Sequence, residues 1–131
     1  MEKALMARLL AAAGLTSLVS NRVYWVIAPQ GVAAPYIIMS VISSVPGYTM
    51  AGKDALTESR VQVDIYAKTY ASAKAISAQV KSALSGFRGG VSGVTFDGIF
   101  IASERDTFTD DASPSDLLGV SIDLMVWNKE T

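Results

Sequence analysis

The carboxylates of this sequence are spaced in ways that could suggest a metal-binding or a catalytic site. Four aspartates lie between residues 106 and 116, and a cluster of oxygen ligands can bind calcium. The segment lacks the alternate-position ligands, central glycine and terminal glutamate of an EF-hand loop. Clustered charges usually serve solvation, so the sequence favours a solvated loop without a metal ion, with the acidic residues Asp106, Asp110, Asp111 and Asp116.

A second candidate is the pair Asp64 and Asp123, because two carboxylates can act together as general acid and general base. Both residues fall on the polar faces of predicted strands. The sequence does not place them close to each other, and it shows no pocket signature around them. Cross-strand pairing with a residue such as Arg60 is the favoured use of these carboxylates.

Other catalytic arrangements lack essential residues. The sequence has no cysteine and no histidine, which removes thiolate nucleophiles, the usual zinc ligands and the usual general base near neutral pH. The glycine-rich segment FRGGVSGV follows a predicted helix instead of opening one, so it lacks the helix N-terminus of a phosphate-binding loop and is predicted to be a turn. We therefore expect no enzyme and no cofactor.

The composition of the chain limits the classes of protein that remain possible. The 131 residues fit one domain, residues 1–131, and a formal net charge of −1 offers no basic field for nucleic acid. No apolar run approaches the roughly 20 residues of a membrane span, and Glu2 and Arg8 argue against a signal peptide. Only 18% of residues are charged, against about 25% in an average domain. This apolar surplus fits either a partner surface or a well-filled core.

The clearest structural pattern is a strand that leads directly into a helix. Residues 57–67 alternate, with Val61, Val63 and Ile65 on one side and polar residues on the other. Thr69 can then cap a helix that ends near Gly86. The apolar stripe of that helix consists of Ala73, Ile76, Val80, Ala83 and Leu84.

The rest of the chain predicts a covering helix and further strands. A helix over residues 2–13 is expected to end at Gly14, and residues 15–21 are expected to form a turn. Strands are predicted at 23–27, 36–45, 94–104 and 117–127. The last strand directs Leu118, Val120, Ile122, Leu124 and Val126 to one side and Ser121, Asp123, Met125 and Trp127 to the other.

Two features of the middle strands suggest contacts with a neighbour. In the 36–45 strand, Ile37, Met39, Val41 and Val45 share one side, while Ile38 and Ile42 lie on the other, as in a central or interface strand. Residues 46–56 are predicted to be a long connection that Tyr48, Met50 and Leu56 make unusually apolar. The predicted fold is a single α+β domain, a mostly antiparallel sheet of four to five strands with two helices packed on one face.

Nearly the whole chain resembles the phage tail-completion, or tail-terminator, family of long-tailed phages, prophages and gene transfer agents. The resemblance rests on EKALMARLLAA, RVYWVIAPQGVAAPYIIMSVIS, ESRVQVDIYAKTYASAKAISAQVKSAL and the closing SERD and LLGVSIDLMVWN. Its most specific part is a strand followed by a Tyr-Ala-x-Ala-Lys helix, and the strand carries Arg60, Gln62, Asp64 and Tyr66.

The resemblance implies a structural virion protein, made in the host cytoplasm and located at the head-proximal end of the tail. It implies a homo-oligomeric, hexameric ring that stops polymerisation of the tail tube and contacts the major tail tube protein and the head-tail connector or stopper. DNA would pass through the ring without specific binding.

A ring needs two different, complementary patches on each subunit. The expected subunit or tube interface consists of Tyr48, Met50, Leu56, Tyr66, Met125 and Trp127, and the uncharged back of the first helix is a further candidate. The expected lining of the lumen is acidic and consists of Asp110, Asp111 and Asp116.

Two alternatives remain open on the sequence. The first is a head–tail connector or another minor tail protein with the same architecture. The second is a small ligand-binding or enzymatic α+β domain, which would show a deep pocket with convergent polar groups.

Overall fold

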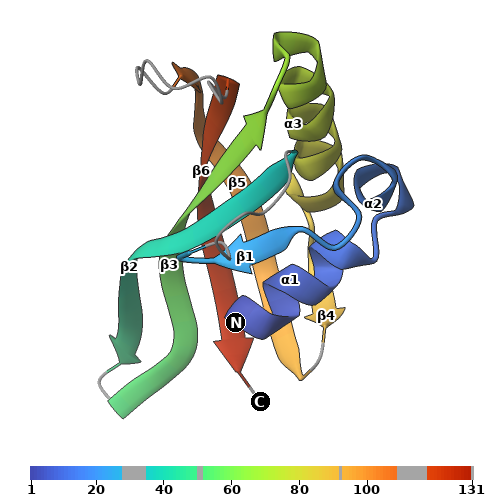
Figure 1. The fold of residues 1–131 in the computed structure, drawn as a ribbon. Helices are drawn as coiled ribbons and strands as arrows, with labels where there is room; N and C mark the ends of the chain where they lie inside the picture. The colour runs from blue at the N-terminus through green and yellow to red at the C-terminus, as the bar shows by residue number, and fades with distance from the viewer. Residues whose placement is uncertain (28–34, 50–51, 92, 109–117, 131) are drawn as a thin grey trace.

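The structure is a computed structural model that describes residues 1–27, 35–49, 52–91, 93–108 and 118–130. Within these ranges the chain forms three helices and six strands (Figure 1). The elements are α1 (Glu2–Leu10), α2 (Ala13–Val19), β1 (Val23–Trp25), β2 (Tyr36–Thr49), β3 (Gly52–Ala67), α3 (Tyr70–Leu84), β4 (Gly89–Val91), β5 (Val94–Phe108) and β6 (Leu118–Glu130).

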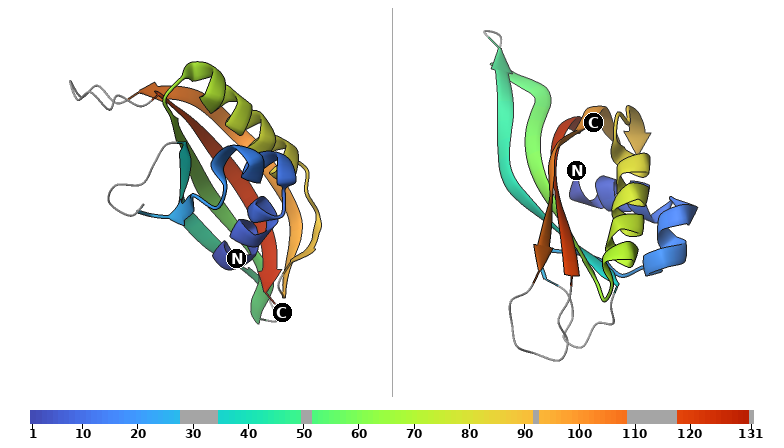
Figure 2. Two further views of the ribbon diagram at one scale, coloured as in Figure 1. Left: turned by 45° about the vertical axis from the view of Figure 1, so that its right-hand side comes forward. Right: turned by 90° about the horizontal axis from the view of Figure 1, so that it is seen from above.

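The strands form one curved sheet in the order β1-β2-β3-β6-β5-β4. All neighbouring strands are antiparallel except β1 and β2, which are parallel. The three helices lie together on one face of this sheet (Figure 2). The α+β class is therefore confirmed, with a mixed sheet of six described strands where four to five were predicted.

The predicted unit of a strand and a covering helix is confirmed in detail. Thr69 caps α3, because its Oγ1 accepts a hydrogen bond from the backbone N–H of Ser72 at 3.1 Å. The apolar stripe of α3 is buried against the sheet at Ala73, Ile76, Val80 and Leu84. Gly86 follows with φ +74°, a left-handed conformation that glycine adopts without strain.

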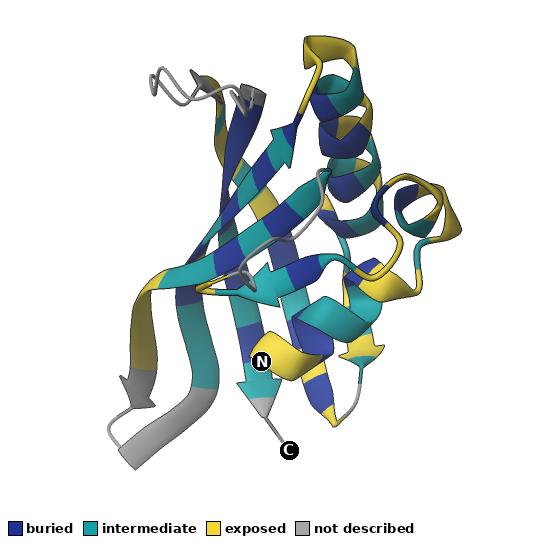
Figure 3. Ribbon diagram, in the orientation of Figure 1, coloured by how far each residue is buried: buried dark blue, intermediate teal, exposed yellow. Residues whose placement is uncertain are grey.

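The core lies between the helices and the sheet. Along β3 the predicted alternation holds, since Val61, Val63 and Ile65 are fully buried while the residues between them remain partly exposed (Figure 3). The matching positions of β6 are buried directly opposite, because Val63 pairs with Ile122 and Ile65 pairs with Val120. The sheet therefore buries one face along its two central strands.

The N-terminal helix prediction was wrong in its boundaries. One helix over residues 2–13 was expected, whereas α1 ends at Leu10 and a second helix, α2, begins at Ala13. The break at Ala12, where the backbone is extended, lets α2 bury Leu15 and Val19 at helical spacing. Gly14 lies inside α2, where the side-chain amide of Gln79 on α3 packs over it, so this glycine does not end a helix.

The predicted connection over residues 46–56 is a β-hairpin. β2 continues to Thr49 and β3 begins at Gly52, with Tyr48 paired to Lys53. Pro46 lies within β2, where a register irregularity between Pro46 and Tyr48 accommodates it. The FRGGVSG segment likewise contains β4, a three-residue strand, where only a turn was predicted.

A bulge also changes the direction of side chains in β2. The register shifts between Val41 and Ser43, which inserts one extra residue and reverses the alternation beyond it. Val45 was expected on the core side with Ile37 and Met39, but its side chain is exposed where the β2–β3 hairpin leaves the rest of the sheet (Figure 3).

Candidate functional site: the open face of the sheet

The sheet face opposite the helices carries most of the polar side chains of the central strands. We call it the open face. The register places four rows of residues on it: Tyr36 and Ile38 on β2; Arg60, Gln62, Asp64 and Tyr66 on β3; Ser121, Asp123, Met125 and Trp127 on β6; and Phe100, Ser103 and Arg105 on β5. In the views of Figure 2, the three helices lie on the other side of these strands.

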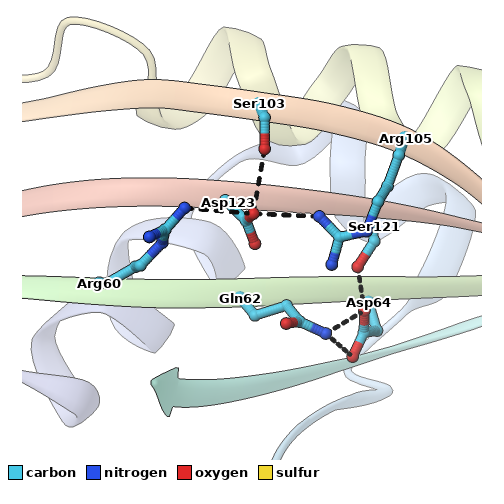
Figure 4. A network of polar contacts seen from close by, with 7 residues as sticks. All are labelled: Arg60, Gln62, Asp64, Ser103, Arg105, Ser121 and Asp123. Atoms are coloured by element: carbon cyan, nitrogen blue, oxygen red, sulfur yellow. Dashed lines mark hydrogen bonds and ion pairs between the residues drawn. The ribbon is translucent and has the colours of Figure 1, made fainter. Parts of the chain in front are cut away.

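Asp123 is the centre of a polar network on this face (Figure 4). Its Oδ2 accepts hydrogen bonds from Ser103 Oγ and from Arg105 Nη1, each at 3.0 Å, and Arg60 Nη2 lies 3.8 Å away. Asp123 is only 8% exposed, because these neighbours cover it. The predicted cross-strand pairing with Arg60 is therefore confirmed.

Asp64 is engaged in a separate set of contacts. The Nε2 of Gln62 lies 3.0 Å from both carboxylate oxygens, and the hydroxyl of Ser121 donates to Oδ1 (Figure 4). Asp64 and Asp123 lie on adjacent strands, but each carboxylate is held by its own donors. The pair therefore shows structural pairing, not the arrangement of a general acid and a general base around a cleft.

An aromatic pair lies at the β1 end of this face. The rings of Tyr36 and Tyr66 stack with their centroids 5.2 Å apart and their planes at 30°. Burial, followed by the nearby negative charge of Asp64, raises the pKa of the Tyr66 phenol. Tyr66 is therefore neutral at physiological pH and offers a flat, partly exposed ring.

The other end of the open face is apolar. Phe100 is 54% exposed and lies opposite Met125, while Trp127 lies opposite Gly98. A Cβ on Gly98 would stand 2.8 Å from the ring of Phe100, so this ring covers the glycine backbone. Phe100, Met125 and Trp127 thus form an apolar area of two aromatic rings and one methionine that no described helix covers.

Ion pairs on the opposite face fix α3 to β5. The carboxylate of Glu104 accepts a hydrogen bond from the hydroxyl of Ser77 and lies 3.1 Å from Lys81 Nζ. The carboxylate of Asp106 lies 2.9 Å from Lys74 Nζ. The hydrogen bond from Ser77, followed by that from Lys81, lowers the pKa of Glu104. The hydrogen bond from Lys74 likewise lowers the pKa of Asp106. Asp106 therefore belongs to a strand and is paired, although it was predicted to lie in a solvated loop.

Some predicted interface residues lie on the open face, and the side chains of others are outside the described part of the structure. Tyr66, Met125 and Trp127 lie on it, and Leu56 is half-buried in β3 beside its partner Lys129. The backbone of Tyr48 lies in the β2–β3 hairpin, but its side chain is outside the described part of the structure. Also outside the described residues are Met50, Asp110, Asp111 and Asp116.

Sequence reasoning missed Ser103, Arg105 and Phe100 as members of this face. Two bulges in β5, between Phe96 and Gly98 and between Ile101 and Ser103, decide which β5 side chains point there. In the sequence, the only signal for these bulges was the small residues Gly98 and Ala102 near them.

Pockets and metal sites add little within the described residues. A groove of about 590 Å³ lies between α1 and the edge of β1, lined mainly by apolar atoms of Met6, Trp25, Val26 and Val41. The described residues contain no group of three or more acidic side chains that could hold a metal ion. Nor does this part of the chain contain a helix long and apolar enough to cross a membrane.

The fold and the open face define a class of protein: a small α+β domain in which Asp64 and Asp123 are held in polar networks on a sheet face that the helices leave uncovered. The chain belongs to the tail completion protein gp17 family, whose family model matches residues 3–129. It is therefore a structural protein of a phage-type tail.

Solved structures share the fold. One is a chain of the virion of a native gene transfer agent particle, 22% identical, with a TM-score of 0.77, covering 98% of this chain and 94% of that chain. A second solved structure is 13% identical, with a TM-score of 0.55, covering 96% of this chain and 95% of that chain. Among curated proteins, none matches this sequence.

Proposed function

We propose that this protein forms a ring, most simply a hexamer, that caps the head-proximal end of a phage-type tail tube in the virion. In this role it stops polymerisation of the tube and joins the tail to the head connector. The match to the tail completion family over residues 3–129 carries the proposal. The fold shared with a chain of a gene transfer agent virion supports it.

The open face is the surface that we propose for contacts in this role. The stacked Tyr36 and Tyr66 at one end and the exposed Phe100 beside Met125 at the other supply aromatic anchors, which contribute strongly to protein interfaces. Arg60 and Arg105, about half exposed, supply donors between these two ends. We assign Tyr66, Met125 and Trp127 to contacts with a neighbouring subunit or with the tube protein, together with Leu56, Tyr48 and Met50.

The proposal also assigns a role to the acidic segment. Asp110, Asp111 and Asp116 would line the lumen, where carboxylates offer DNA phosphates no attraction and let the duplex pass. The partners of the ring would be the major tail tube protein on one side and the connector or stopper protein on the other.

The test is deletion of the gene followed by electron microscopy of the particles. A cap that stops polymerisation predicts tails of uncontrolled length that are not joined to heads, with both defects restored by the wild-type gene. Tails of normal length joined to heads would contradict the proposal. Tails of uniform length that accumulate unjoined would instead identify a head–tail connector, the alternative role within the same class.

A further inference from the structure

The two long borders of the sheet are each left open over part of their length. On one border, β1 pairs only with Ile37–Met39 of β2, so no described strand pairs with the outer edge of β2 from Ser40 to Thr49. On the other border, β4 pairs only with Val94–Phe96 of β5, and Gly86 N donates to the carbonyl of Ile99. The outer edge of β5 from Phe100 to Phe108 has no described strand beside it.

We propose that these two open edges pair with each other between successive subunits, so that β2 of one copy adds to β5 of the next. This inference rests on the proposed ring. The open edge of β2 and that of β5 differ in sequence, as the two halves of a head-to-tail interface must. Backbone N–H and C=O groups along each edge supply the hydrogen bonds.

The direction of the strands favours this pairing. β2, β3, β6 and β5 alternate in direction, because each neighbouring pair is antiparallel. In a copy brought alongside in the same orientation, β2 therefore runs antiparallel to β5. Antiparallel pairing is the more stable arrangement per residue.

The charges along both edges are compatible with pairing. Proteins usually protect open edges with charged side chains, yet β2 has no charged residue from Tyr36 to Thr49. On β5 the charged residues are engaged within the subunit: Glu104 with Lys81, Arg105 with Asp123 and Asp106 with Lys74. Pro46 removes one possible donor from the β2 edge, and a bulge lies at Ile42, but the remaining residues can form a ladder.

The positions of β1 and β4 fix how the two copies are offset. In the register of the sheet, β5 Thr107 shares a row with Tyr36 of β2, and Phe100 shares a row with Ser43. Without an offset, the open parts face each other only near Ser40–Ser43, because β1 covers one side of this overlap and β4 covers the other. To pair them along their length, each copy must slide by about five residues, or about 17 Å at the rise of a β-strand.

This offset has the size that a closed sheet requires. A shift of about five residues for every four strands, with strands about 4.8 Å apart, corresponds to a strand tilt of about 40°. Strands that close into a barrel tilt by about 35–45°. The short strands β1 and β4 cover opposite ends of the two outer edges. They therefore determine the direction and the length of the offset between neighbouring subunits.

Disulfide cross-linking tests the pairing, because the chain has no native cysteine. Val45 and Ala102 are both exposed, lie on the two open edges and take part in no described polar contact, and the offset brings them near each other between copies. The double variant Val45→Cys with Ala102→Cys should give a ladder of covalent multimers in purified particles. The control Val45→Cys with Thr95→Cys uses an exposed residue on the part of β5 that β4 covers, and should give none.

The outcomes separate the two proposals. Multimers from the Val45 and Ala102 pair alone support the pairing. Rings in the particle with no such multimers, or with equal multimers from the control, overturn the edge pairing and leave the proposed function standing. Absence of the protein from the tail overturns both.

A charge on the edge gives a second measurement. Val45→Lys should abolish ring formation, measured as mass in solution or incorporation into particles, while circular dichroism remains native, because Val45 is 58% exposed. The control Val26→Lys adds the same charge at an exposed position beyond β1 and should leave assembly intact. Normal assembly of Val45→Lys would overturn the edge pairing.

Discussion

Arg105 Nη1 donates to Asp123 Oδ2 at 3.0 Å across the β5–β6 pair, although the two residues are diagonal neighbours. Asp123 lies directly opposite Ser103, and Arg105 lies directly opposite Ser121. Because of this diagonal contact, one carboxylate on β6 interacts with Ser103 and Arg105 of β5 and with Arg60 of β3. The network thus ties β3, β6 and β5 together on the face that the helices leave open.

Loss of the Asp123 carboxylate should destabilise the domain. We expect Asp123→Ala to lower the free energy of unfolding by about 1–3 kcal/mol, because it removes charge-assisted hydrogen bonds at a nearly buried position. The measurement is urea unfolding. Asp97→Ala is the control, since Asp97 forms a more exposed ion pair with Lys129 at 3.8 Å and should cost under about 1 kcal/mol. Equal losses would contradict the central role of Asp123.

The two faces of β3 predict opposite responses at adjacent positions. Val63→Asp should prevent folding, because it places an unpaired charge in the fully buried core. Asp64→Ala should leave the fold intact and cost about 1 kcal/mol, since it removes the hydrogen bonds from Gln62 and Ser121 on the open face. Circular dichroism and solubility distinguish the variants. Equal solubility of the two variants would contradict the assignment of Val63 to the buried face and Asp64 to the open face.

Stability should fall in acid partly through Glu104. Its folded-state pKa is lowered from an ordinary value near 4.5, chiefly by Ser77, so its contribution is present above about pH 4.5 and is lost as the pH falls through the lowered folded pKa. Glu104→Gln should flatten this part of the curve of unfolding free energy against pH. The idea fails if Glu104→Gln retains the wild-type slope below about pH 4.5.

The cap of α3 should be measurable separately. Thr69→Ala removes the acceptor for the Ser72 N–H, so we expect a loss of about 1 kcal/mol in the free energy of unfolding. Hydrogen exchange should show faster exchange in the first turn of α3. Thr69→Ser retains the hydroxyl and should behave like the wild type, and a loss as large as that of Thr69→Ala would point to the methyl group instead.

Local pattern alone predicted the central unit of the fold. The alternation from Val61 to Ile65 and the spacing of Ala73, Ile76 and Val80 each give one apolar face, and burial of those faces follows from the hydrophobic effect. Thr69 was predictable as a cap for the same local reason, since its hydroxyl satisfies a backbone donor only three residues away.

Register could not be predicted in the same way. Bulges at Ile42 and near Gly98 and Ala102 shift the side-chain direction by one residue, and they depend on how two distant strands fit together. For this reason Val45 was assigned to the wrong side, and the hairpin over residues 46–56 was taken for a loop. The break between α1 and α2 has a similar origin, because burial of Leu15 and Val19 depends on their place in the shared core.

The sequence by itself determined which residues form the buried face of β3, β6 and α3, and it carried the resemblance to tail completion proteins, because both depend on residue types at fixed spacing. Only the tertiary structure decided that Asp123 is shared by Arg60, Arg105 and Ser103, and that the short strands β1 and β4 leave part of the outer edges of β2 and β5 open. These features join strands far apart in the chain, and strand order and register arise from the packing of the whole sheet.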